Sequence, residues 1–66
     1  PAGLTEREVD VLRHLASGMT NRQIATALGI SAKTVGTHVE HIYAKAGVRT
    51  RAAATLFAIE ERLVVR

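Results

Sequence analysis

Residues 20–42 read TNRQIATALGISAKTVGTHVEHI, and this pattern predicts two short helices joined by a tight turn. Thr20 begins a T-x-x-Q capping box, in which side chains and backbone amides at a helix start bond each other. Gly29 is typical of a helix end, and Ser31 of the start of the next helix. Only Gly29, Ile30 and Ser31 lie between the predicted helices. A short connection with glycine at the corner is typical of a helix-turn-helix.

Similar signals occur on both sides of this stretch. Thr5 and Glu8 form a second capping box, Gly18 is a helix stop, and Thr50 is an N-cap candidate. Apolar residues recur at helical spacing, and no alternating segment suggests a strand. The chain is therefore expected to be a single all-α domain, 1–66, with four helices near 6–17, 21–28, 32–46 and 51–63.

The composition limits the function further. The chain has 66 residues, 47% of them hydrophobic but only 3% aromatic, so the core must be aliphatic. It has no cysteine, which excludes disulfides and thiolate metal sites. No apolar run approaches the roughly 20 residues of a membrane span. We expect a cytoplasmic protein without a membrane partner.

The net charge is +3 and the isoelectric point is about 10.2. A basic domain is compatible with a nucleic-acid partner, but the charge has this meaning only if the cations gather on one surface.

The stretch from residue 4 to residue 63 resembles the LuxR-type (GerE-like) helix-turn-helix domain of NarL-like response regulators and quorum-sensing regulators. The resemblance is carried by LTERE from Leu4, G.TN..IA..L.IS..TV..H from Gly18 to His38, I..K.GV from Ile42 to Val48, and Arg51 with Ala54. It implies a four-helix DNA-binding domain with its third helix in the major groove of double-stranded DNA and its fourth helix in a homodimer contact. The chain begins with Pro1, so we expect it to be the C-terminal part of a larger regulator. RNA polymerase is a further candidate partner.

The helical repeat of residues 32–46 indicates which side chains face DNA. Val35, Val39 and Ile42 share one face, which is the predicted core side. In a helix-turn-helix the N-terminal part of the second helix reaches base edges. The candidate base-reading residues on the other side are Lys33, Thr34, Gly36, Thr37, Glu40 and His41.

Two of these residues depart from the family pattern. Many family members have lysine where this chain has Gly36. Either the bare backbone permits close approach to a base, or a lysine contact has been lost. Glu40 has three interpretations: an acceptor for cytosine N4, a surface carboxylate paired with a cation, or a residue that disfavours wrong sequences.

Candidate phosphate contacts gather at the start of the second predicted helix and around the start of the fourth, where cations and helix amides attract anions. They are Thr20, Asn21, Arg22, Lys45, Arg49 and Arg51, and Lys33 of the base-reading set could also meet a phosphate. The alternative for any single cation is an ordinary solvated surface residue.

The fourth predicted helix is apolar over a wide arc, which indicates a second packing partner. Leu56, Ile59 and Leu63 are the candidate dimer residues; alternatively, the thin core uses both sides of the helix. His38 and His41 are spaced i, i+3 but have no evident third ligand, so we expect no metal site and no cofactor. No catalytic constellation is apparent, and we do not expect an enzyme.

The sequence thus predicts the DNA-binding domain of a transcription regulator that binds paired half-sites as a dimer. The alternative is a protein-interaction module with the same fold and weakened DNA binding. The segment TVGTHVEHIYAKAGV also resembles a subgroup in which the domain follows an HD-type domain in place of a receiver. The sequence leaves the signal-receiving domain open.

Overall fold

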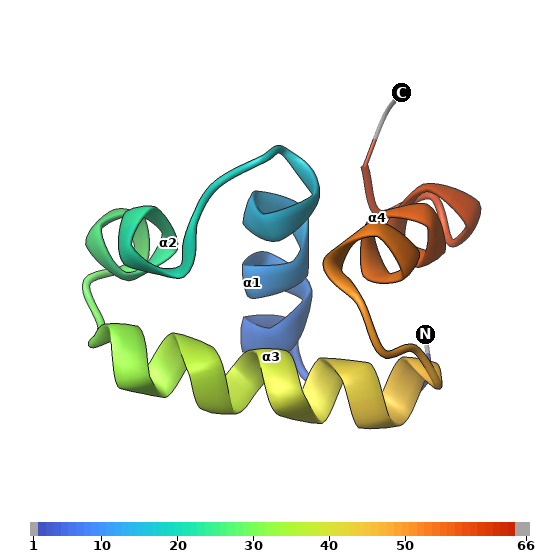
Figure 1. Cartoon of the computed structure of the whole chain (residues 1–66), viewed down its shortest axis with the longest axis horizontal. Coiled ribbons are helices and arrows are strands. Elements are labelled where there is room, and N and C mark those ends of the chain that lie inside the picture. The colour runs from blue at the N-terminus through green and yellow to red at the C-terminus, as the bar shows by residue number, and fades with distance from the viewer. Residues whose placement is uncertain (1, 65–66) are drawn as a thin grey trace.

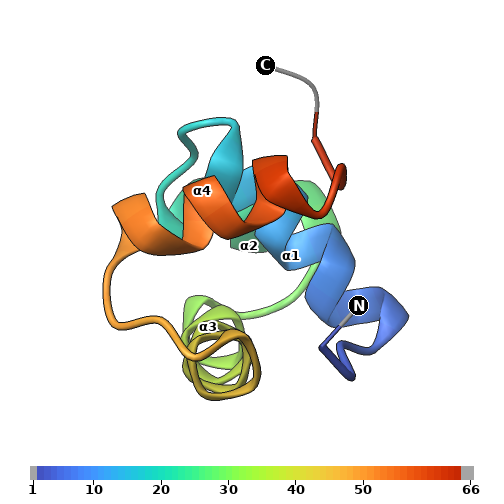
Figure 2. The same cartoon turned by 90° about the vertical axis from the view of Figure 1, so that its right-hand side faces the viewer.

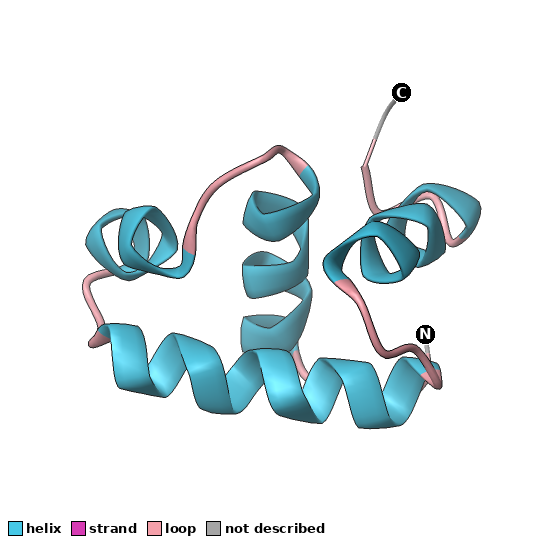
Figure 3. Ribbon diagram, viewed as in Figure 1, coloured by secondary structure: helices cyan, strands magenta, loops and turns pink. Residues whose placement is uncertain are grey.

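The fold was obtained as a computed structural model, which describes residues 2–64. Four helices follow one another: α1 (Glu6–Ala16), α2 (Asn21–Leu28), α3 (Ala32–Ala46) and α4 (Arg51–Glu60). Loops alone connect them, and residues 2–64 contain no strand (Figure 3). The predicted all-α fold is confirmed.

Every helix begins at the residue that the sequence indicates. Thr5 and Thr20 each complete a capping box, and the Ser31 and Thr50 side chains accept hydrogen bonds from backbone amides three residues later. Each cap satisfies an amide that the first turn leaves without a helical partner. Polar side chains at the four N-caps therefore set the helix starts.

The helix ends differ slightly from the prediction. The first helix ends at Ala16, one residue early, and α4 ends at Glu60 although 51–63 was predicted. Arg62 adopts a left-handed φ of 58°, and the Leu63 amide donates to the Ala58 carbonyl at 2.8 Å. This bond closes a turn that ends the helix and folds Leu63 back onto the core.

A small aliphatic core joins all four helices. Its largest fully buried side chains are Leu12, Ile24, Ile42, Val11 and Val35. On α4 the core contributors are Ala54 and Ala58, both fully buried. Small residues there let α4 approach α1 closely.

The helices are arranged so that α3 lies along one side of the molecule, with α1 standing nearly upright over its middle and α2 and α4 near its two ends (Figure 1). The view along α3 shows the other helices on one side of it only (Figure 2). The longest helix therefore has a long outer surface that no other helix covers. Within residues 2–64 no helix is long and apolar enough to cross a membrane.

Candidate nucleic-acid interface

The connection between α2 and α3 has the geometry of a helix-turn-helix. Gly29 adopts the left-handed region, at φ 69° and ψ 34°, and its amide donates to the Ala25 carbonyl. The Ile30 amide also donates to Ala25, at 3.0 Å, and the Ile30 side chain packs against the core. Ser31 then caps α3. Glycine reaches this backbone region without the strain that a Cβ causes, so Gly29 makes the corner and Ile30 anchors it.

The outer surface of α3 carries most of the predicted base-reading residues. Lys33, Thr34, Thr37, Glu40 and His41 are exposed, whereas Val35, Val39 and Ile42 are buried on the opposite side. The helical repeat thus separates the two faces as predicted.

Gly36 lies at the edge of the outer surface. It is half-buried, and a Cβ at this position would meet no atom within 4 Å apart from its chain neighbours and the backbone of its own helix. Its backbone is ordinary helix, so neither crowding nor an unusual φ requires glycine at this position. The packing of the free domain gives no reason for the missing side chain.

The hydroxyl groups on this surface are already engaged. Thr37 Oγ1 donates to the Lys33 carbonyl at 3.3 Å. Thr34 Oγ1 and Ser31 Oγ share a hydrogen bond of 2.8 Å. By contrast, Glu40 has no ion pair or side-chain hydrogen bond with any residue that the structure describes. Its carboxylate is thus an uncommitted acceptor.

Two of the predicted phosphate-binding cations, Arg22 and Arg49, are exposed and make no ion pair within residues 2–64. Lys33 on α3 is also exposed and makes no ion pair within these residues. Arg22 lies in the first turn of α2, where the helix amides and dipole also favour an anion. These three side chains are free to meet phosphates.

Arg51 is engaged within the domain. Its guanidinium donates to the Asn21 Oδ1 atom at 3.2 Å and also to the Met19 carbonyl. These bonds tie the first residue of α4 to the segment that begins α2. Thr20 is also engaged, because its hydroxyl accepts from the Gln23 amide at 3.2 Å.

Lys45 is engaged as well. Its Nζ atom lies 2.6 Å from Glu8 Oε1, and His41 Nδ1 lies 3.6 Å from Glu8 Oε2. Glu8 is only 3% exposed. The hydrogen bond from Lys45, followed by the one from the Thr5 amide, holds the pKa of Glu8 below its ordinary value, against the effect of burial. Lys45 therefore has a carboxylate partner before any phosphate arrives.

Sequence reasoning did not single out Glu8 beyond its role in the capping box. The available signal was its spacing, because residue 8 lies three and four residues before the apolar Val11 and Leu12 and so shares their helix face. Its partners, His41 and Lys45, follow it by 33 and 37 positions in the sequence. No local pattern indicates such a pairing.

The candidate dimer residues occupy different environments. Leu56 is 51% exposed, whereas Ile59 is half-buried and Leu63 packs against the core beyond the end of α4. Arg13 Nε donates to the Leu63 carbonyl at 3.0 Å, which ties α1 to the segment after α4. Leu56 is thus the large apolar side chain of α4 that is most open to a partner.

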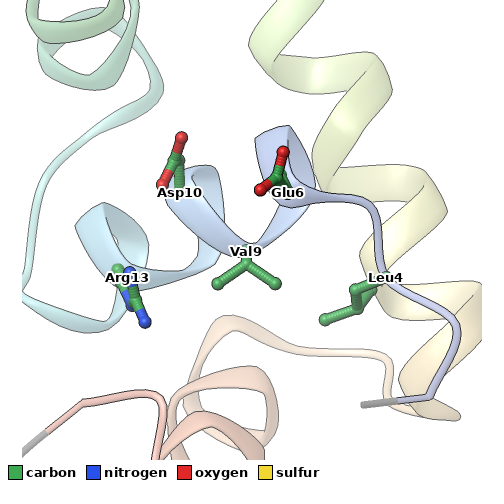
Figure 4. A pocket seen from close by; sticks show the side chains of 5 residues that line it. All are labelled: Leu4, Glu6, Val9, Asp10 and Arg13. Carbon is green, nitrogen blue, oxygen red and sulfur yellow. The ribbon is translucent and has the colours of Figure 1, made fainter.

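A hollow of about 480 Å³ lies beside α1 and is lined by Leu4, Glu6, Val9, Asp10 and Arg13. Figure 4 shows Leu4, Val9 and Arg13 pointing toward the side of α4, and Glu6 and Asp10 pointing the other way. The lining has no paired nucleophile and base. Within residues 2–64 no group of three or more potential ligands gathers to hold a metal.

Comparisons with known proteins agree on one family. Residues 2–58 match the family described as "Bacterial regulatory proteins, luxR family". The nitrate/nitrite response regulator NarP of Escherichia coli (strain K12) is 49% identical over 59 residues, which are 89% of this chain and 27% of NarP. The response regulator VraR of Staphylococcus aureus (strain Mu3) is 43% identical over 61 residues, 92% of this chain and 29% of VraR.

A solved structure is also similar. The response regulator ChrA of a heme-sensing two-component system matches with a TM-score of 0.87 and 47% identity, over 94% of this chain and 31% of that chain. The chain thus spans less than a third of the length of these relatives. The chain belongs to the LuxR family of bacterial regulatory proteins and corresponds to the helix-turn-helix DNA-binding domain of that family.

Proposed function

We propose that the domain binds double-stranded DNA in a sequence-specific way, with the N-terminal part of α3 in the major groove. The observation that carries this proposal is the outer surface of α3, which no other helix covers and which presents Lys33, Thr37 and Glu40. The major groove, about 12 Å wide, admits an α-helix, and its base edges differ in donor and acceptor pattern. A polar, uncovered helix that follows a tight turn fits this groove.

Phosphates on either side of the groove meet the cations that remain free. Arg22, with the N-terminus of α2, and Arg49, before α4, are placed to hold the backbone, together with Lys33. The other four candidates contribute mainly by holding α2, α3 and α4 in place, because each has a partner within the domain. They are Thr20, Asn21, Lys45 and Arg51. A DNA partner implies the cytoplasm of a bacterium as the location.

We further propose that two copies bind paired half-sites through a contact between α4 helices. The proposed contact is supported by Leu56, with Ile59 beside it on α4. Half of the Leu56 side chain is exposed, and a second copy of the helix would cover it. The relatives named as response regulators support a place for this domain in a response regulator, with RNA polymerase as a candidate partner. A protein-interaction module of the same fold remains the rival function.

Binding to random duplex DNA at two salt concentrations, followed by selection from a random pool, tests the proposal. We expect salt-sensitive binding and enrichment of a defined sequence. Arg22→Ala should weaken binding to all sequences about equally, because a phosphate contact carries no base information. Arg13→Ala removes the same charge on the α4 side of α1 and serves as the matched control (Figure 4). Binding that is insensitive to salt and enriches no sequence would favour the protein-interaction module.

A further inference from the structure

Gly36 and Glu40 are four residues apart on α3, so they lie about 40° apart around the helix and one turn apart along it. A helical side chain leans toward the N-terminus and covers the turn before its own Cα. The side chain of Glu40 therefore leans over Gly36. The surface beneath it is bare, because Gly36 has no side chain and a Cβ there would meet only open space.

This arrangement moves the Glu40 carboxylate toward the part of α3 that lies deepest in a groove. Glu40 is past the middle of a helix that spans Ala32–Ala46, whereas base contacts come from the N-terminal residues of a recognition helix. Leaning back by one turn, about 5.4 Å, brings the carboxylate level with Gly36. A longer side chain at position 36 would occupy that space.

The hydrogen-bonding chemistry of the surface also favours Glu40. The hydroxyls of Thr34 and Thr37 are engaged within α3 and its cap. The Glu40 carboxylate has no partner among residues 2–64 and accepts hydrogen bonds only, so it requires a donor on a base edge. In the major groove the donors are cytosine N4 and adenine N6, and adenine also presents the N7 acceptor beside its donor, which repels a carboxylate.

We propose that Gly36 and Glu40 act as one specificity-determining unit that selects a cytosine in each half-site: Glu40 accepts from cytosine N4, and the bare Gly36 leaves the space through which it reaches. This inference rests on the proposed function. It makes Glu40 a selective residue rather than an attractive one, because phosphates repel its charge and only a suitable base offsets that repulsion. Lys33 on the same surface is then the neighbouring cation that can contact a guanine.

Selection from a random duplex pool, with the 66-residue chain, three single variants and one double variant, tests the proposal. The unchanged protein should enrich cytosine at one fixed position of each half-site. Glu40→Gln keeps the shape but replaces the carboxylate with an amide, which pairs with adenine N6 and N7. We expect the preferred base to change from cytosine to adenine, with affinity for the cytosine site reduced by about tenfold or more.

The Gly36 variants test the coupling. Gly36→Lys should remove the cytosine preference, because the lysine fills the space and pairs with Glu40 at i, i+4. The same change should have no effect on that position in a Glu40→Gln background. Gly36→Ala, which adds only a methyl group, should retain the preference and serves as the control. Circular dichroism confirms that each variant is folded.

Two results would overturn the proposal, and they are distinguishable. In the first, the protein enriches a defined site that lacks the cytosine, or Glu40→Gln leaves the base preference of the site unchanged. This result contradicts the Gly36–Glu40 unit but leaves the proposed DNA binding intact. In the second, no protein, including the unchanged one, enriches any sequence or binds DNA in a salt-dependent way. This result contradicts the proposed function together with this inference.

Discussion

Lys45 Nζ donates a 2.6 Å hydrogen bond to Glu8 Oε1, and this contact joins the first turn of α1 to the last turn of α3. Glu8 is buried, whereas the Lys45 side chain keeps 35% of its surface exposed. A buried carboxylate needs its partners, because an unpaired charge in the core is strongly destabilising. The pair therefore fixes the C-terminal part of α3 against α1, and with it the orientation of the outer surface.

The first prediction concerns this pair and its pH dependence. Glu8→Gln keeps an oxygen for the Thr5 amide but loses the charge that faces Lys45, so the free energy of unfolding should fall by about 1–2 kcal/mol near neutral pH. The Glu8 pKa is lowered in the folded state. Its stabilisation is thus present above the ordinary glutamate pKa, about 4.3, and disappears as pH falls through the lowered folded value.

Urea unfolding at neutral and acid pH measures this difference. The stability gap between the unchanged protein and Glu8→Gln should narrow as the solution is acidified. Glu6→Gln, at an exposed acid in the same first turn, is the control and should show little change. A gap that is constant over the whole acid range would mean that the charge of Glu8 does not stabilise the fold.

The second prediction concerns the salt dependence of DNA binding. The sequence suggested five cations on phosphates, namely Arg22, Lys33, Lys45, Arg49 and Arg51. Internal partners hold Lys45 and Arg51, so three free contacts remain, and the slope of log K against log salt should be about −2.7 rather than about −4.5. Glu8→Gln releases Lys45 and should steepen the slope by about 0.9. A slope near −4.5 in the unchanged protein would show that DNA displaces both internal partners.

The helix starts were predictable because each depends on residues close together in the sequence. Thr5 with Glu8 and Thr20 with Gln23 are complete boxes within four residues, and a local pattern suffices to recognise them. The end of α4 was not predictable in the same way, since Arg62 adopts the left-handed region without the glycine that usually marks it.

The candidate site was predictable in part for a similar reason. The helical repeat separates Lys33 and Glu40 from buried Val35 without knowledge of the fold. It cannot tell whether an exposed cation already has a partner elsewhere in the chain. Lys45 and Arg51 meet groups that are distant in sequence, and only the three-dimensional packing reveals this.

A third prediction follows from Arg51. Its guanidinium bonds both the Met19 carbonyl and Asn21, so Arg51→Ala should destabilise the fold by about 1 kcal/mol and weaken DNA binding through the loosened start of α2. Arg51→Lys retains the charge but lacks the planar fork that reaches two acceptors. Thermal unfolding and DNA titration should show lysine to be a poor substitute. Full rescue by lysine would indicate that charge alone matters at this position.

The fourth prediction tests the proposed dimer contact. Leu56 is 51% exposed, so Leu56→Glu should leave the melting temperature of the monomer nearly unchanged. It should reduce cooperative binding to paired half-sites, because the contact would then bury a charge. Binding to a single half-site is the internal control and should change little. Unaltered cooperativity would place the dimer contact away from Leu56.

The last prediction compares two glycines with opposite backbone requirements. Gly36 has ordinary helical geometry and open space around an added Cβ, whereas Gly47 ends α3 at φ 70°. Gly36→Ala should raise the free energy of unfolding by about 0.5–1 kcal/mol, because alanine loses less backbone entropy in a helix. Gly47→Ala should lower the free energy of unfolding by about 1 kcal/mol or more, because a Cβ disfavours the left-handed region.

Denaturant unfolding of both variants provides the comparison. If Gly36→Ala is more stable yet binds the selected operator less tightly, the bare position serves close approach to DNA; if Gly36→Lys raises stability and operator affinity together, Gly36 records a lost lysine contact. A loss of stability in Gly36→Ala would contradict the open environment on which both interpretations depend.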